Sequence, residues 1–221
     1  MAMKQAMTVF YRSIFDTYQH LWTLVWATML WWICILPVVT SGPATAGLFY
    51  VVKKIRNGEP AVPGDFFKGA HKYKGIGLKI SCCSIFITVP GGIYFFILLG
   101  TGSFIAYFTA MIILYMVLMW FLLLLYVMPL MVEQDIHSLS LLLKRSFRLL
   151  SENYLFTINM ALYLLLLTFF STVITIIMAV WAGWIAKNAY NALIFLLHKH
   201  EVADYEFSGD VSWKGAWRTW K

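Results

Sequence analysis

Two carboxylates and an imidazole occupy alternate positions after a long apolar run, as Glu133, Asp135 and His137. Carboxylate and imidazole groups are common ligands of divalent metal ions. In a helix, however, side chains two residues apart do not face each other, so these three would not converge on one ion. We therefore interpret residues 133–137 as a solvated loop and predict no metal site there.

A second candidate for chemistry is Lys187, which lies near Asn188 and Asn191 in the last apolar segment. An unpaired ionisable group in lipid costs free energy and therefore tends to be functional. If the helix begins near Trp184, Lys187 is within one turn of the outer interface, where its apolar stem can carry the ammonium to water. We favour this snorkelling position and keep a polar contact with a neighbouring helix or partner as the alternative.

Motifs of the common catalytic sites are absent from the sequence. It contains no His-Glu-x-x-His, no glycine-rich phosphate loop ending in Lys-Ser/Thr, and no Gly-x-Ser-x-Gly. The cysteines Cys34, Cys82 and Cys83 lie in apolar stretches, and the two adjacent ones are poorly placed to bridge each other. We therefore predict a protein that is not an enzyme and has no catalytic, cofactor-binding or metal site.

The composition is that of a membrane protein built from spanning helices. Of the 221 residues, 61% are hydrophobic and 12% are charged, which excludes an ordinary soluble protein. At roughly 20 residues per span, the apolar residues suffice for about six spans and leave no room for a soluble domain. The net charge of +7 comes from Lys and Arg between the apolar runs. We assign this charge to membrane orientation and anionic headgroups, not to nucleic acid.

The apolar runs predict an all-α, polytopic membrane helix bundle with five long transmembrane helices and one short return helix. Thr40 as a hydroxyl cap and Pro43 in a first helical turn would open the short helix, residues 44–54. A kink is expected at Pro90. The 154–197 run is too long for one span, so we divide it near its paired Trp181 and Trp184. The five long spans are residues 21–39, 80–99, 104–132 and the two halves of 154–197.

Two segments are amphipathic and basic, residues 65–73 and 139–150. Each has apolar residues at helical spacing and Lys or Arg on another face, which is typical of helices that lie along a membrane surface. We expect them to be lids that close the inner end of the bundle, with a docking surface for another membrane protein as the functional alternative. The candidate contact residues are Asp65, Phe66, Phe67, Lys144, Arg145 and Arg148.

Positive charge predicts the orientation. The N-terminus, the 53–79 and 133–153 segments and the C-terminal tail carry Lys and Arg and would face the cytoplasm, whereas the turns at 40–43 and 100–102 carry no charge. Residues 1–200 then form a single transmembrane domain of the cell membrane, and residues 201–221 form a cytoplasmic tail. If the short helix instead stays on the cytoplasmic side, five spans result and the N-terminus is external.

A distinctive pattern spans residues 35–74. Pro37, Thr40, Gly42 and Pro43 form Pro-x-x-Thr-x-Gly-Pro, and an Asp-Phe-Phe triplet follows at 65–67. This pattern resembles the YesL family, small integral membrane proteins of mainly Gram-positive bacteria with a domain of unknown function. Members are often encoded beside carbohydrate ABC importers and polysaccharide-degrading enzymes. The resemblance implies an accessory role in oligosaccharide uptake and supplies no catalytic residues, so the four positions from Pro37 to Pro43 are expected to be architectural.

The expected function is therefore that of a non-enzymatic accessory or assembly subunit of a carbohydrate ABC importer. Its partners would be the permease subunits, together with the ATPase, a substrate-binding lipoprotein and membrane lipids. The alternative is a stand-alone channel or transporter for a small neutral solute, with a path past the breaks at Pro37 and Pro90. A wet cavity within the chain would favour transport, and a dry bundle with an exposed apolar flank would favour a partner.

Overall fold

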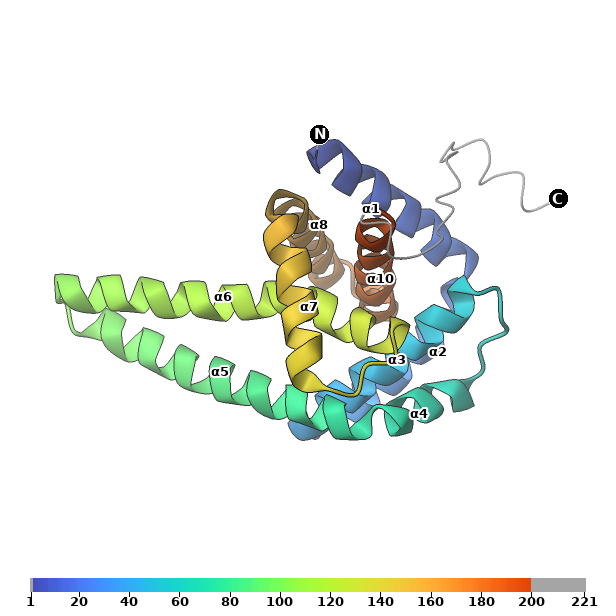
Figure 1. Ribbon diagram of the computed structural model, residues 1–221, viewed down its shortest axis with the longest axis horizontal. Helices are drawn as coiled ribbons and strands as arrows, with labels where there is room; N and C mark the ends of the chain where they lie inside the picture. The colour runs from blue at the N-terminus through green and yellow to red at the C-terminus, as the bar shows by residue number, and fades with distance from the viewer. Residues whose placement is uncertain (1, 200–221) are drawn as a thin grey trace.

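The computed structural model describes residues 2–199, and the side chains of all of these except residues 2, 4, 175 and 176. Every regular element in this range is a helix, so the predicted all-α class is confirmed there (Figure 1). The predicted tail, residues 201–221, lies outside the described residues. In chain order the helices are α1 (Ala2–Gln19), α2 (Leu21–Ile35), the 3-10 turn η1 (Val38–Thr40), α3 (Ser41–Arg56), α4 (Pro63–Lys72), α5 (Lys74–Gly100), α6 (Phe104–Glu133), α7 (Leu139–Glu152), α8 (Tyr154–Val173), α9 (Thr175–Met178) and α10 (Trp181–Lys199).

Helices α5 and α6 form an antiparallel hairpin that projects far beyond the other helices (Figure 1). The turn between them has Gly102 at φ +69°, a conformation that glycine adopts without the steric cost of a Cβ. The α5 helix continues through Pro90 as one element. The projecting halves expose large apolar side chains, including Phe86, Phe96 and Phe104. A surface of this kind is favourable in hydrocarbon and unfavourable in water.

Within the described residues, three helices, α5, α6 and α8, are long and apolar enough to cross a membrane. The α2 helix is apolar but has only 15 residues, whereas a span over residues 21–39 was expected. It ends early because Pro37 lacks the N–H that a continuing helix needs, and the chain is extended at this residue (ψ 102°). The turn η1 then redirects the chain into α3.

The short helix expected at residues 44–54 is longer than predicted and deeply buried. It is α3, and most of its side chains are enclosed by α2, α4, α5, α6 and α10. The Thr40 hydroxyl does not cap it, contrary to our expectation. That hydroxyl instead donates to the carbonyl of Pro37 at 2.7 Å, while the Gly42 amide donates to Ser81 Oγ of α5 at 2.7 Å. A neighbouring helix therefore satisfies the first turn of α3.

The division of the last apolar run is confirmed. The α10 helix begins at Trp181, where the paired tryptophans indicated, whereas α8 already ends at Val173 and the short α9 lies between them. The Trp181 ring packs on Trp31 and Trp32 of α2, and its indole N–H donates to Thr168 of α8 at 3.2 Å. The first turn of α10 is thus fixed by two other helices.

The first helix, α1, lacks a long apolar run and was not anticipated. Its buried residues Ala6 and Val9 face the bundle, and the Phe10 ring stacks on Tyr163 of α8 with centroids 5.2 Å apart. Farther along, Ser13 and Asp16 face α10. The chain therefore begins with an amphipathic helix laid against α8 and α10.

Candidate functional site

The two parts of the 35–74 pattern meet at one surface pocket of about 550 Å³. Pro37, Thr40 and Pro43 line it from the α2–α3 connection, and Phe66 and Phe67 line it from α4. His71 and Lys74 add polar groups to an otherwise largely apolar wall. We call this pocket the motif groove. Residues that the sequence separates by more than twenty positions thus share one site.

Glycine packing holds the walls of the motif groove together. A Cβ at Gly42 would lie 2.0 Å from the carbonyl oxygen of Gly77 on α5, and one at Gly47 would lie 2.6 Å from the carbonyl oxygen of Phe66 on α4. Real Cβ atoms do not approach so closely, so both positions require glycine. The architectural role expected for Gly42 is explained by this contact with α5.

The carboxylate of Asp65 fixes the start of α4. It accepts the Val62 backbone N–H at 3.1 Å and receives the ammonium groups of Lys54 at 3.1 Å and Lys68 at 3.3 Å. The backbone hydrogen bond from Val62, followed by the two lysines, holds the pKa of Asp65 below its usual value. Asp65 therefore makes its contacts within the chain and stabilises the start of α4.

The neighbouring phenylalanines differ in exposure. The side chain of Phe66 is fully buried, whereas Phe67 is 52% exposed at the edge of the motif groove. Of the candidate contact residues on α4, Asp65 and Phe66 are thus occupied by packing, and Phe67 remains accessible to another molecule.

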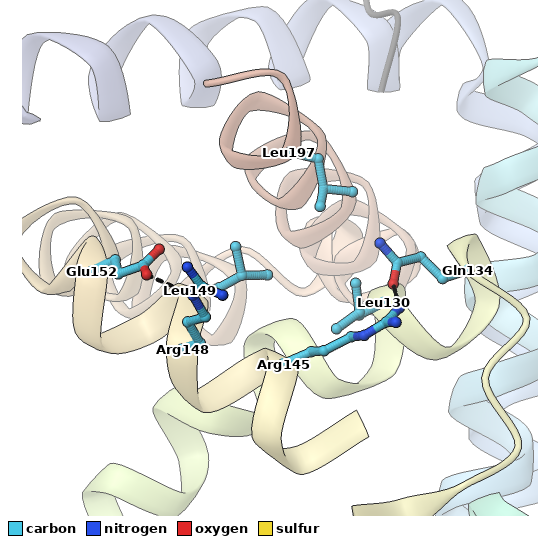
Figure 2. A pocket seen from close by; sticks show the side chains of 7 residues that line it. All are labelled: Leu130, Gln134, Arg145, Arg148, Leu149, Glu152 and Leu197. Carbon is cyan, nitrogen blue, oxygen red and sulfur yellow. Dashed lines mark hydrogen bonds and ion pairs between the residues drawn. The ribbon is translucent and has the colours of Figure 1, made fainter. Parts of the chain in front are cut away.

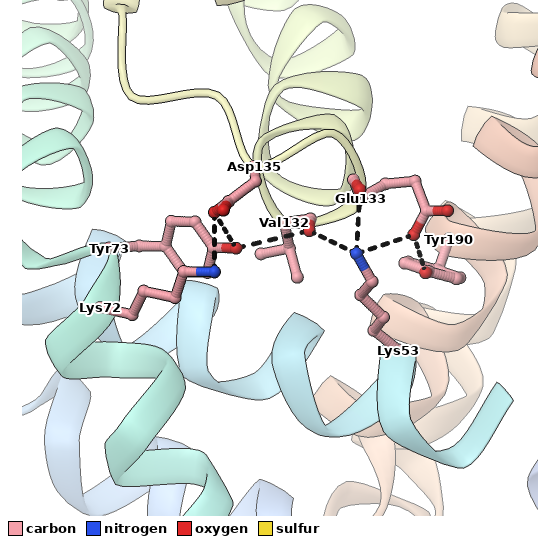
Figure 3. A network of polar contacts seen from close by, with 7 residues as sticks. All are labelled: Lys53, Lys72, Tyr73, Val132, Glu133, Asp135 and Tyr190. Atoms are coloured by element: carbon pink, nitrogen blue, oxygen red, sulfur yellow. Dashed lines mark hydrogen bonds and ion pairs between the residues drawn. The ribbon is translucent and has the colours of Figure 1, made fainter. Parts of the chain in front are cut away.

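A network of polar contacts ties the end of α6 to α3 and α10 (Figure 3). The Lys53 ammonium donates to the carbonyl oxygens of Val132 at 3.0 Å and Glu133 at 2.9 Å, and it lies 3.5 Å from the Glu133 carboxylate. A cation here complements the negative end of the α6 dipole and satisfies its last carbonyls. The Tyr190 hydroxyl of α10 donates to the same carboxylate. Glu133 thereby links three helices.

Asp135 faces the other side of the network (Figure 3). Its carboxylate accepts the Tyr73 hydroxyl at 2.8 Å and the Lys72 ammonium at 2.9 Å, and His137 lies 3.4 Å away. The Lys72 hydrogen bond is the main cause that lowers the pKa of Asp135, while burial and the facing carboxylate raise the pKa of Tyr73.

Glu133 and Asp135 therefore bind different helices, although Asp135 lies beyond the end of α6 and helical spacing does not govern its direction. Residues 133–137, which we expected to be a solvated loop, are only partly solvated, because these carboxylates join α3, α4 and α10 to the end of α6. Among the described residues, no three His, Cys, Asp or Glu side chains lie close enough to hold a metal ion.

Lys187 does not snorkel. Its side chain is 4% exposed and its ammonium lies 3.8 Å from the Asp16 carboxylate of α1. Asn191, one turn later, donates to Ser13 Oγ at 2.9 Å and to Asp16 at 3.2 Å. The alternative, a polar contact with a neighbouring helix, is the one observed. Sequence reasoning missed Asp16 because α1 was not anticipated, and no local spacing connects it to Lys187.

The basic residues of α7 are exposed. Lys144 lies on one side of the helix, while Arg145 and Arg148 line a pocket of about 350 Å³ between α7 and the ends of α6 and α10 (Figure 2). Arg145 donates to Gln134 and Arg148 donates to Glu152 at 2.7 Å. The structure thus separates the three candidate contact residues of α7 into two surfaces.

Comparison with known proteins matches part of the chain to a family. Residues 24–108 match the family described as "Protein of unknown function, DUF624". No curated protein and no solved structure matches the chain. The matched segment runs from α2 through the start of α6, and it includes every residue of the motif groove.

Proposed function

We propose that the chain is a multi-pass subunit of the cell membrane, without enzymatic activity, that assists a carbohydrate ABC importer by docking to its permease subunits. In this arrangement α5, α6 and α8 cross the membrane, and the basic 53–79 and 133–153 segments face the cytoplasm. The lengths and apolar composition of α5, α6 and α8 support the membrane placement. The ion pairs Lys53–Glu133 and Lys72–Asp135 support a common side for the 53–79 and 133–153 segments.

The observation that carries the proposal is the motif groove. Pure packing motifs bury their side chains, whereas Pro37, Thr40 and Phe67 remain at the wall of a pocket that opens on the surface. An apolar groove beside membrane-length helices suits a helix of another membrane protein. The carbohydrate importer as the partner rests on the resemblance to the YesL family, whose pattern forms this groove.

The packing of the bundle also favours a partner. Tyr126, Tyr190 and Leu193 are fully buried between α6 and α10 and fill the space that a solute path through these helices would need. The α5–α6 hairpin meanwhile offers an extended apolar flank. Close packing between α6 and α10 together with an exposed apolar flank is the arrangement expected of a subunit that works through contact.

Crosslinking tests the docking proposal. A photoreactive amino acid at Phe67, in chains purified from gently solubilised native membranes, is expected to form an adduct with a permease subunit identified by mass spectrometry. Phe147 of α7, 58% exposed and distant from the groove in sequence, is the control position and should give little of that adduct. Absence of permease, ATPase and substrate-binding lipoprotein from the purified material would remove the accessory role.

Transport of a small neutral solute is a second candidate, favoured by the polar set formed by the buried Lys187 and Asn191 and the half-buried Asp16. Ionisable groups buried between membrane helices often mark a path for solutes. Vesicles that contain the purified chain would then release a trapped neutral solute faster than vesicles without protein, and Asn191→Leu would slow that release. Equal release from vesicles with and without the chain would exclude this candidate.

A further inference from the structure

The pocket beside α7 combines paired guanidinium groups with an apolar floor. Arg145 and Arg148 are one helical turn apart and stand at its rim, while Leu130, Leu149 and Leu197 form its base (Figure 2). These three leucines come from α6, α7 and α10 and are all buried. Its volume of about 350 Å³ lies in the range of small-ligand sites, roughly 300–1,000 Å³.

The connectivity of the chain fixes where this pocket lies. The α7 helix joins α6 and α8, which are both long and apolar enough to cross a membrane. A helix that connects two consecutive spans lies at the membrane face where the first span ends and the second begins. Phe147 and Leu141 of α7 are also exposed, as in helices that lie at the boundary between headgroups and acyl chains.

The guanidinium groups retain donors for an anion. A guanidinium has five N–H donors, and Arg145 uses one for Gln134 while Arg148 uses its Nε for Glu152. Arginine presents planar, paired donors that match phosphate oxygens. Glu152 opposes an anion in the pocket, and its ion pair with Arg148 offsets part of that repulsion.

We propose that the pocket formed by Arg145, Arg148 and the leucines Leu130, Leu149 and Leu197 binds the phosphodiester headgroup of an anionic phospholipid. The guanidinium groups hold the phosphate, and the leucines contact the adjoining glycerol and acyl carbons. An apolar floor favours a lipid over an acidic protein segment or a free anion, because neither of these buries much apolar surface. This site depends on the membrane placement of the chain and is independent of the docking role of the motif groove.

Lipid binding to the full chain tests the site. The chain is purified in detergent, delipidated and incubated with phosphatidylglycerol or with phosphatidylcholine of the same acyl chains, and the first bound lipid is measured by native mass spectrometry. We expect preferential binding of phosphatidylglycerol, weakened about tenfold in Arg145→Gln/Arg148→Gln, as for the loss of charge-assisted hydrogen bonds. Equal binding of the two lipids would overturn the proposal.

Two further variants separate a pocket from general surface charge. Lys144→Gln removes an exposed positive charge of α7 outside the pocket and should leave the preference within about twofold, as for a solvated charge. If Lys144→Gln lost as much of the preference as Arg145→Gln/Arg148→Gln, general attraction to surface charge would explain the binding, and the proposed lipid site would be refuted. Glu152→Gln removes the opposing carboxylate and should strengthen phosphatidylglycerol binding, a gain that misfolding does not produce. Weaker binding in this variant would also count against the site.

Competition identifies the source of the anion. Excess inorganic phosphate or a hexaglutamate peptide should leave the bound phosphatidylglycerol in place. Complete displacement by phosphate would indicate a free-anion site, and displacement by the peptide would assign the pocket to an acidic protein segment. Either result would overturn the lipid assignment.

Discussion

Gly77 shows how little space separates α3 from α5. A Cβ at this position would lie 2.8 Å from the Pro43 nitrogen and 3.0 Å from the Gly42 carbonyl carbon. These are backbone atoms, so one of the helices would have to move. We expect Gly77→Ala to lower the free energy of unfolding by about 1–3 kcal/mol, the usual cost of overpacking, measured by thermal unfolding in detergent.

Gly75 supplies the matched control, because it lies in the same turn of α5 and a Cβ there meets no atom within 4 Å. Gly75→Ala should be neutral or slightly stabilising, since alanine favours a helix over glycine by about 1 kcal/mol. Equal melting temperatures for the two variants would contradict the close approach of α3 and α5.

Asp65 gives α4 a dependence on pH. Its pKa is lowered in the folded chain by the Val62 amide and by Lys54 and Lys68, so the ionised form stabilises the fold. This contribution is complete above the unfolded-state pKa of about 4 and is lost as the pH falls through the lower folded-state value. Thermal unfolding between pH 6 and pH 3 should therefore show a smaller loss of stability in Asp65→Asn than in the unaltered chain.

Glu59 is the comparison for this titration, because it pairs with the same Lys54 at 3.7 Å but is 52% exposed. Glu59→Gln should keep the acid sensitivity of the unaltered chain, since an exposed ion pair contributes little to stability. If Asp65→Asn and Glu59→Gln gave the same pH profile, the Asp65 carboxylate at the start of α4 would not be the source of the loss of stability at acid pH.

Asp135 combines a charge with an unusual backbone conformation. Its φ of +52° is left-handed, a region where asparagine and aspartate are tolerated far better than alanine. Asp135→Asn should therefore cost only the pairing with Lys72 and Tyr73, whereas Asp135→Ala should cost the pairing and add about 1 kcal/mol of backbone strain. Chemical denaturation of both variants separates these contributions, and an alanine variant as stable as the asparagine variant would exclude the strain.

At the scale of elements, one ion pair joins the first helix to the last. Removal of Asp16 leaves the buried Lys187 without its counter-charge, and Asp16→Ala should destabilise the chain by on the order of 2 kcal/mol. This lies below the range for fully buried pairs because Asp16 is 30% exposed. The double variant Asp16→Ala/Lys187→Met should recover most of the loss, since the methionine keeps the volume without a charge. A double variant no more stable than Asp16→Ala would show that the pair is not what joins α1 to α10.

Helices with uniform apolar runs were predictable, whereas helices defined by their neighbours were not. The hairpin α5–α6 and the start of α10 at Trp181 follow from run length and interfacial tryptophans. The α1 helix has no long apolar run, and the enclosure of α3 depends on glycines that α4 and α5 approach. Long-range packing decides these features, and spacing along the chain does not encode it.

The candidate sites show the same division. Both parts of the 35–74 pattern could be found in the sequence, but their convergence on one groove requires the turn at η1 and the docking of α4 on α3. Lys53 and Tyr190 lie 80 and 57 residues from the α6 end that they bind. No helical or strand spacing relates residues so far apart, so only the fold reveals the network.

At the scale of the whole molecule, the hairpin sets a test of orientation. If α5 and α6 cross the membrane, their connecting turn and the α6–α7 loop must lie on opposite sides. Ser103 and Ser138 mark these two places, are both exposed and have extended backbones, so cysteine replaces either with little disturbance. Gly102 is less suitable because of its positive φ.

In a chain whose native cysteines are replaced by alanine, Ser103→Cys should react with an impermeant thiol reagent in intact cells. Ser138→Cys should react only after the membrane is opened. The reverse pattern would place the basic segments outside, against the distribution of positive charge, and reaction of both cysteines in intact cells would mean that the hairpin does not cross the membrane.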